Sequence, residues 1–256
     1  MLDLARGVRT RLTFRQSQGS YPVWSPDGSR IAFAAGSTLD TLFEKDSSGA
    51  GAEKELYQKA GEIKIPISWS RDGHFLLFYT ISAPKTGSDL WVLPLGSATG
   101  ARQPVLLLGT EFNEGEGAFS PDMRWIAYVS DESGRTEVYV RPFLASGPSG
   151  KPALGEGKWQ VSRDGATPDA PRWRADGKEL FFLAPNNSAV MAVNVNGNGP
   201  AFQMGTPQQL FSVPLNNVGV DVTADGKRFL LAAPPGSQNA SAPITVILNW
   251  PALLKR

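Results

Sequence analysis

A short turn motif recurs five times along the chain at nearly constant spacing. The first copy is Trp24-Ser25-Pro26-Asp27-Gly28, and the later copies are centred on Asp72, Asp122, Asp176 and Asp225. Successive aspartates are 45, 50, 54 and 49 residues apart. A period of this length indicates a fold built by stacking one supersecondary unit, so the repeat constrains the architecture more than any other feature.

Each turn is embedded in the same pattern of short apolar segments. In the second copy, a buried run at residues 75–78 is followed by apolar segments at 90–93 and 105–108. Four short strands per period, with no helical periodicity, predict an all-β protein. We expect a β-propeller of about five four-stranded blades, forming one domain over residues 1–256. The blade hairpins are expected near residues 21–35, 66–80, 116–130, 170–184 and 219–233.

The residues of the turn have separate physical roles. Proline presets φ at the first central position, aspartate accepts a hydrogen bond from the backbone two residues on, and glycine supplies a positive φ. The structural turn residues are therefore Asp27, Gly28, Asp72, Gly73, Asp122, Asp176, Gly177, Asp225 and Gly226. Met123 stands where the other copies have glycine, so a left-handed Met123 is predicted, at a cost of roughly 1–2 kcal/mol. The aromatic residue that opens most copies, such as Trp24, is expected to wedge between blades.

The first 14 residues do not fit the period. Segments 2–4 and 11–14 resemble outer strands of a preceding or closing blade that lack their inner partners. Either residues 11–14 complete the last blade, giving five blades, or the chain is an incomplete part of a larger propeller of six to eight blades. The second arrangement is favoured, because segment 2–4 duplicates a third strand that residues 244–248 already supply.

Composition excludes several classes of function. With 25 basic and 24 acidic residues the net charge is +1, so no nucleic-acid footprint is expected. Cysteine is absent and His74 is the sole histidine, which disfavours zinc, thiol chemistry and a catalytic triad. His74 is instead expected at a solvent-facing hairpin position. Neither a signal peptide nor a membrane helix is recognisable, and no cofactor or metal is predicted.

One group of polar residues could form a site. Loops on the same face of one blade would bring together Asn113, Glu114, Glu116, Asp131, Glu132 and Arg135, with Arg172 from a neighbouring loop. Lys64, Asp169 and Asn217 are expected nearby. The group could bind a ligand, cation or peptide, although solvated turns are the favoured interpretation. Paired carboxylates could also hydrolyse a glycoside, which leaves a carboxylate-based hydrolase as an alternative.

The hairpin motif, with the strand sequences of residues 89–95 and 137–143, resembles the TolB-type, WD-repeat-like propellers. Residues 2–14, 110–143 and 242–250 further resemble the C-terminal, extracytoplasmic propellers of bacterial transmembrane serine/threonine kinases of the acidobacterial type. Kinase motifs themselves are absent from the sequence. The resemblance implies a non-catalytic sensor that binds a protein, peptide or small molecule in the periplasm or outside the cell. A TolB-like envelope interaction scaffold is the other alternative.

Overall fold

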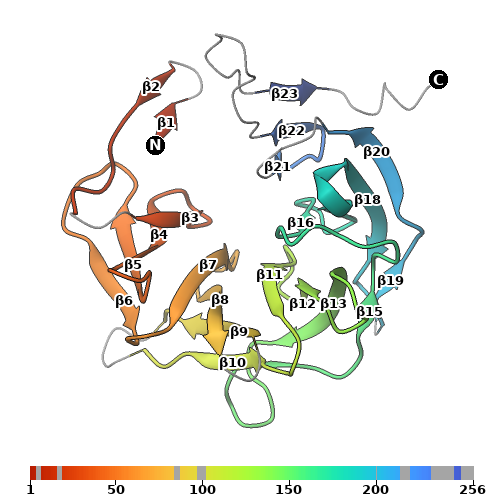
Figure 1. The fold of residues 1–256 in the computed structure, drawn as a ribbon, viewed down its shortest axis with the longest axis horizontal. Coiled ribbons are helices and arrows are strands. Elements are labelled where there is room, and N and C mark those ends of the chain that lie inside the picture. The colour runs from red at the N-terminus through yellow and green to blue at the C-terminus, as the bar shows by residue number, and fades with distance from the viewer. Residues whose placement is uncertain are drawn as a thin grey trace. The chain divides into compact units, whose positions relative to one another are not determined.

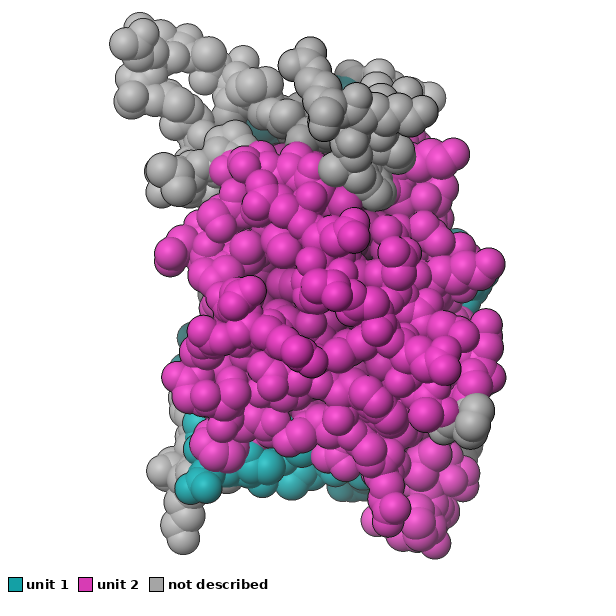
Figure 2. Space-filling view, turned by 90° about the vertical axis from the view of Figure 1, so that its right-hand side faces the viewer, with its two compact units in different colours: residues 1–111 teal, residues 112–256 magenta. Residues whose placement is uncertain are grey.

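The computed structural model describes residues 1–3, 7–15, 19–83, 87–96, 102–199, 201–213, 220–231 and 245–248. The chain divides into two compact units, residues 1–111 and 112–256, which Figure 2 distinguishes by colour. The described residues contain no α-helix, only a single 3-10 turn at Pro185–Asn187. The expected extent of one domain over 1–256 stays a prediction, and each unit is treated by itself.

Unit 1 contains a small hairpin and two four-stranded antiparallel sheets (Figure 1). The small hairpin pairs β1 (Leu2–Asp3) with β2 (Val8–Arg9). The first sheet, in the order of the sequence, is β3 (Ser20–Trp24), β4 (Arg30–Ala35), β5 (Thr41–Asp46) and β6 (Lys54–Gln58). The second is β7 (Ile63–Trp69), β8 (Phe75–Ala83), β9 (Gly87–Pro94) and β10 (Val105–Leu108). Strands β3 and β7 lie side by side, so the two sheets stack as adjacent blades.

Unit 2 continues the same meander. Its first blade contains β11 (Glu114–Phe119), β12 (Trp125–Ser130), β13 (Glu137–Leu144), β14 (Ala153–Leu154) and β15 (Trp159–Gln160). The next contains β16 (Arg172–Trp173), β17 (Glu179–Leu183), β18 (Ala189–Asn196), β19 (Gln203–Met204) and β20 (Gln208–Ser212). The last contains β21 (Val220–Val222), β22 (Arg228–Leu231) and β23 (Thr245–Leu248). This repetition confirms the predicted all-β, blade-built fold class.

Two differences from the expected strands have local causes. Four strands were expected in each blade, but the outer strand of the first blade of unit 2 is split, because β14 and β15 pair with opposite ends of β13 and the chain turns at Gly157, where φ is 88°. Residues 11–14, expected as an outer strand, form no strand. The preceding residues pair back on the N-terminus instead, with Met1 and Thr10 exchanging backbone hydrogen bonds of 2.7 and 2.9 Å.

Apolar cores fill the spaces between successive blades of each unit. In unit 1, the small residues Ala32 and Ala34 of β4 face the large side chains of Trp69 and Phe78. In unit 2, alternate residues of β17 point into two different cores, with Leu180 in one and Phe181 in the other. Since successive strand residues face opposite sides of a sheet, burial of both sets shows that this blade is covered on both faces.

The predicted aromatic wedge is confirmed in two copies of the motif and absent from the first. Trp69 is 8% exposed in the core between the blades of unit 1. Trp173 packs on the core of unit 2 and donates from Nε1 to the carbonyl of Ala118 at 3.2 Å. Trp24, however, is 48% exposed. Strand β3 of the first blade covers β7 of the second, but no described segment covers Trp24 on β3 in the same way.

The five turns have the predicted backbone geometry. Gly28, Gly73, Gly177 and Gly226 have φ between 70° and 77°, and Met123 has φ 61°. The left-handed conformation predicted for Met123 is therefore confirmed. The space around Gly73 is open, with no atom within 4 Å of an added Cβ. A side chain there would therefore cost only the free energy of holding a non-glycine residue in the left-handed conformation.

We expect Met123→Gly to raise the free energy of unfolding by about 0.5–1 kcal/mol, since relief of the left-handed strain exceeds the entropy that glycine adds to the unfolded chain. The matched substitution, Gly73→Ala, should lower it by about 1 kcal/mol. Urea unfolding followed by tryptophan fluorescence measures both. A loss of stability in the glycine variant would contradict the strain assigned to Met123.

Candidate functional site

Hydroxyl side chains stabilise four of the five turns by the same pair of hydrogen bonds. In the first turn, Ser25 Oγ donates to Asp27 Oδ1 at 2.6 Å and accepts from the Arg30 backbone N–H at 2.9 Å. Ser70, Ser120 and Thr223 do the same in the second, third and fifth turns. In the fourth, Arg174 Nε donates to Asp176 at 2.8 Å instead. Each turn aspartate is thus held by its own hairpin, consistent with the turn-capping role predicted for these residues.

Asp27 is the most strongly stabilised of these carboxylates. Its oxygens accept from Ser25 Oγ, from Ser29 Oγ at 2.7 Å and from the Ser29 backbone N–H at 3.1 Å. These bonds favour the ionised form and lower the pKa of Asp27 from 3.8 to about 2. Its stabilising contribution is therefore present above pH 3.8 and is lost as the pH falls through about 2.

Ser25→Ala should raise the pKa of Asp27 toward its ordinary value of 3.8, because the largest contributor to the shift is removed. A carboxyl carbon NMR titration between pH 1 and 6 measures this value directly. Ser120→Ala, which removes the same hydroxyl from the third turn, is the control and should leave Asp27 unchanged. An unaltered pKa in the Ser25 variant would show that the hydroxyl does not stabilise the carboxylate.

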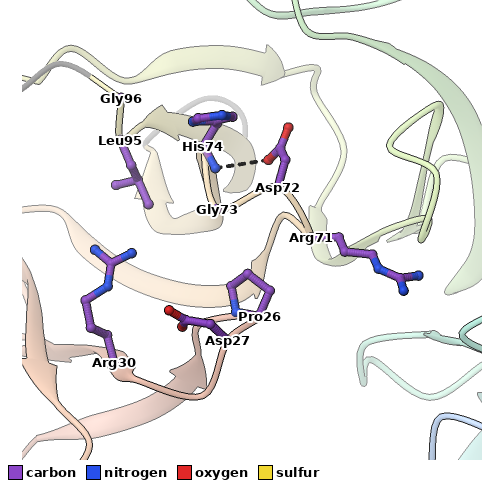
Figure 3. A pocket seen from close by; sticks show the side chains of 9 residues that line it. All are labelled: Pro26, Asp27, Arg30, Arg71, Asp72, Gly73, His74, Leu95 and Gly96. Atoms are coloured by element: carbon purple, nitrogen blue, oxygen red, sulfur yellow. Dashed lines mark hydrogen bonds between the residues drawn. The ribbon is translucent and has the colours of Figure 1, made fainter.

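A pocket of about 580 Å³ opens between the first two turns, within unit 1. Pro26, Asp27 and Arg30 line it from one side and residues 71–74 from the other, and Leu95, just after β9, adds an apolar wall (Figure 3). We call it the turn pocket. It combines Arg30 and His74 with the carboxylates of Asp27 and Asp72. It lies at turns for which the sequence predicted a purely structural role, and not at the polar group predicted around Glu114.

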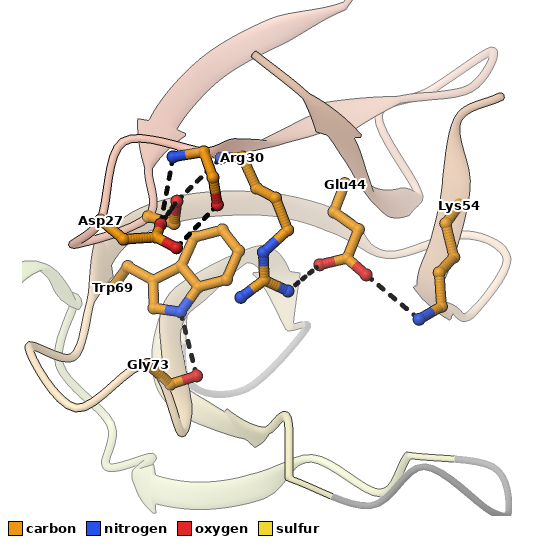
Figure 4. A network of polar contacts seen from close by, with 8 residues as sticks. Asp27, Arg30, Glu44, Lys54, Trp69 and Gly73 are labelled. Carbon is orange, nitrogen blue, oxygen red and sulfur yellow. Dashed lines mark hydrogen bonds and ion pairs between the residues drawn. The ribbon is translucent and has the colours of Figure 1, made fainter. Parts of the chain in front are cut away.

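Two contacts hold the guanidinium of Arg30. Its Nη1 donates to Glu44 Oε2 at 2.9 Å, and its guanidinium carbon lies 4.9 Å from the centroid of the Trp69 ring (Figure 4). Glu44 is 6% exposed and also pairs with Lys54 at 3.2 Å. Trp69 is in turn held by a 3.3 Å bond from Nε1 to the Gly73 carbonyl. A guanidinium stacked on a ring and tied to a carboxylate loses little entropy on binding.

His74 lines the pocket from the second turn. Its backbone N–H donates to Asp72 Oδ1 at 3.0 Å, while its side chain is exposed. The predicted solvent-facing position is therefore confirmed. Among the described residues, the imidazole has no hydrogen-bond partner, and neither do Nε and Nη2 of Arg30. The pocket thus presents unused donors next to Asp27, both of whose oxygens already accept hydrogen bonds, and Asp72, which accepts at Oδ1.

Part of the polar group predicted from the sequence does come together in unit 2. Asn113 donates from its backbone N–H and from Nδ2 to the two oxygens of Asp131, at 2.8 and 2.6 Å. Glu132 follows Asp131 and pairs with Lys158 at 2.5 Å. Arg135 donates from Nε to Glu137 at 2.7 Å. The Asn113 contact joins the turn after β12 to the residue before β11, and the Lys158 contact joins that turn to the segment before β15.

Other members of that group lie elsewhere than expected. Glu114 is fully buried at the start of β11, in register with Ser130. Glu116 occupies a bulge in the same strand, with φ 45°. Both were expected on an exposed loop. Arg172 begins β16, where it donates to the Ala170 carbonyl at 2.5 Å and lies 3.4 Å from Asp221.

The neighbouring residues have structural surroundings. Lys64 is 0% exposed and its Nζ donates to three backbone carbonyls. Asp169 accepts from the Ala170 N–H at 2.8 Å. Asn217 lies outside the described residues. A ligand-binding role for the group around Glu114 stays a prediction.

Sequence reasoning missed Arg30, the residue that organises the turn pocket. The sequence carries no clear signal for it, because the equivalent position is apolar in the second and third repeats but charged in the fourth and fifth, where it is Glu179 and Arg228. In the described parts of the chain, no three histidine, aspartate or glutamate side chains are grouped so that they could hold a metal ion, and no helix is long and apolar enough to cross a membrane.

Comparison with solved structures identifies the fold. TolB from Acinetobacter baumannii aligns with a TM-score of 0.62 at 18% identity, over 88% of this chain and 51% of TolB. A putative TolB from Agrobacterium tumefaciens gives 0.56 at 16% identity, over 74% of this chain and 64% of that one. The β-propeller domain of Cps50 (Swd1) from Myceliophteria thermophila gives 0.55 at 15% identity, over 92% and 71%.

The chain therefore has a β-propeller fold like that of TolB-type and WD-repeat proteins. It spans about half the length of the first TolB and just under two thirds of the second. No protein-family model and no curated protein matches the sequence. At these identities the likeness concerns the fold, so function has to be argued from the residues of the chain.

Proposed function

We propose that this chain is a non-catalytic β-propeller that binds a protein or peptide partner. The observation that carries the proposal is the turn pocket, where a rigidly held guanidinium keeps unused N–H groups beside an exposed imidazole. Pre-organised donors lower the entropic cost of binding. Turns presented by adjacent blades on a rigid scaffold are typical places for recognition.

The state of the carboxylates supports binding rather than hydrolysis. Asp27 accepts three hydrogen bonds, Glu44 pairs with two cations, and both oxygens of Asp131 accept from Asn113. A carboxylate whose lone pairs are occupied in this way is poorly suited to act as a nucleophile or a general base. These contacts favour the binding scaffold over the carboxylate-based hydrolase.

A peptide-library screen tests this function. Random peptides are selected on the immobilised protein, resynthesised with a fluorophore, and titrated by fluorescence anisotropy, with heat-unfolded protein as the control for non-specific adsorption. We expect saturable binding in the micromolar range and, by mass spectrometry, intact peptides after prolonged incubation. Cleavage of the selected peptides, or a library without any saturable binder, would count against a non-catalytic binding role.

We further propose that the chain serves as the extracytoplasmic sensor of a receptor-type serine/threonine kinase. The support is the resemblance of residues 2–14, 110–143 and 242–250 to the propellers of such kinases. Sequencing the transcript that carries this reading frame tests the idea. An in-frame kinase domain and membrane helix upstream are expected, whereas an in-frame stop codon directly upstream would contradict it and favour a TolB-like scaffold.

A further inference from the structure

We infer that the turn pocket binds the carboxylate of an acidic residue in a peptide, with Arg30 and His74 as its donors. The inference rests on the proposed peptide-binding function and assigns it a site and a ligand chemistry. The pocket volume, about 580 Å³, exceeds what a carboxylate alone fills and accommodates a side chain with its flanking backbone.

Arg30 is the primary anchor. One edge of its guanidinium is used on Glu44, and Nε and Nη2 remain without a partner among the described residues. Figure 3 shows the side chain extending from the first hairpin into the pocket, toward Leu95. A planar guanidinium with two adjacent free N–H groups matches the two oxygens of a carboxylate. Stacking on Trp69 keeps this edge oriented before a ligand arrives.

His74 provides a second donor from the other hairpin. The imidazole faces a set of charged groups that includes Asp72 of its own turn, Asp27 and Arg30 of the first hairpin, and Arg71. In Figure 3 Arg71 extends away from the centre of the pocket. A carboxylate placed between Arg30 and His74 would accept from both hairpins, because the imidazole carries an N–H donor in either protonation state.

The two aspartates of the pocket explain the preference for a peptide over a simple anion. Both oxygens of Asp27 are occupied within its own turn. Asp72 accepts two bonds at Oδ1, and Oδ2 has no partner among the described residues. An acidic peptide residue carries a carboxylate for Arg30 and a backbone N–H for Asp72, whereas the two charges of a hydrogen phosphate dianion would be repelled more strongly by the two aspartates.

His74 also makes the site directly observable, since it is the only histidine in the chain. In a carbon-edited NMR spectrum its ring gives one Cε1–H signal, which is titrated with acetyl-Gly-Glu-Gly-amide. We expect a saturable shift with a dissociation constant on the order of 1 mM. The matched peptides with Gln or Lys in place of Glu, and inorganic phosphate, should each bind at least tenfold more weakly.

Variants connect the shift to the pocket. Arg30→Met keeps the aliphatic stem on Trp69 but removes the donors, and should weaken the glutamate peptide at least tenfold. Arg30→Lys keeps the charge without the planar fork and should give an intermediate loss. Arg228→Met changes the equivalent position of the fifth repeat and should have no effect. Circular dichroism checks that each variant is folded. If Arg30→Met does not fold, the loss of affinity in Arg30→Lys tests the role of the guanidinium.

Several results would overturn the inference. One is an unchanged His74 signal at saturating peptide. Another is binding of the glutamate peptide by both Arg30 variants as tightly as by wild type. The third is tighter binding of phosphate or of the lysine peptide than of the glutamate peptide. Failure of the inference can be told from failure of the proposed function. If library-selected peptides bind Arg30→Met as well as wild type, the binding function stands and this site assignment is wrong.

Discussion

Glu137→Ala is expected to lower the free energy of unfolding by about 3–5 kcal/mol, because it leaves buried donors without their acceptor and removes most of a fully buried side chain. The Glu137 side chain is 0% exposed at the start of β13. Its carboxylate accepts from Arg135 Nε at 2.7 Å and from the Gly165 N–H at 3.0 Å, and also from the Ser162 hydroxyl. Ser162 Oγ in turn accepts from the Val138 N–H at 2.8 Å.

The network explains why the loss should be large. The carboxylate links the turn before β13 to the segment that follows β15, so the alanine variant leaves a buried N–H and a buried hydroxyl without their acceptor. Urea unfolding at neutral pH measures the loss. Glu137→Gln keeps the volume and one acceptor oxygen, and should lose about 1–2 kcal/mol. Arg135→Ala tests the exposed partner, whose side chain is 58% exposed, and should lose less than about 1 kcal/mol.

A small effect of Glu137→Ala would contradict this account. If the alanine variant were within about 1 kcal/mol of wild type, the buried bonds would have to be replaced by water or by rearrangement of the 162–165 segment. The ranking of the three variants is the sharper test. If Arg135→Ala lowered the stability as much as Glu137→Ala does, the surface ion pair, and not the buried hydrogen bonds, would account for most of the stabilisation.

The sequence predicted the blades well because their determinants are local. Pro26, Asp27 and Gly28 act within one turn, and the alternation of apolar residues acts within one strand. Even the exception at Met123 could be anticipated, since the position in the turn dictates its φ. The splitting of the outer strands was not predicted, because the bend at Gly157 is decided by how β14 and β15 each pair with β13.

The candidate site was harder to predict because it is assembled from residues about 45 positions apart. Arg30 and His74 meet only when two hairpins stack, and neither belongs to a recognisable motif. Glu116 was expected on the loop that enters its blade, but it lies in a bulge of β11, between two glycines, with φ 45°. Glycine-rich sequence is compatible with either outcome, and strand pairing decides between them.

Lys64 illustrates the same difficulty, since a lysine at the start of a strand is usually solvated. Its ammonium is 0% exposed and donates to the carbonyls of Asp40, Lys59 and Glu62 at 2.9, 2.8 and 3.0 Å. All three N–H groups are therefore used, which is how a buried ammonium is tolerated. The bonds hold the segment before β5 against the turn between β6 and β7.

Lys64→Met should lower the free energy of unfolding by about 3–5 kcal/mol, because three backbone carbonyls lose their buried donor while the side-chain volume is nearly kept. Urea unfolding measures the loss. Lys59→Met is the control, because Lys59 is 56% exposed and pairs with Glu62 at the surface; it should change stability by less than about 1 kcal/mol. Equal effects of the two variants would show that the buried ammonium has no special role.

The pH dependence of the stability of wild type and of Lys64→Met gives an independent check. Burial lowers the pKa of Lys64 below its ordinary value of 10.5, against the opposing charges of Glu62 and Asp40. Between the two values the unfolded chain binds the proton more tightly, so the folded state gains stability as the pH rises. The stability difference between wild type and Lys64→Met should therefore widen from neutral pH to about 10.5. A stability difference that stays constant over that range would mean that the three carbonyls stabilise the ammonium as well as water does in the unfolded chain.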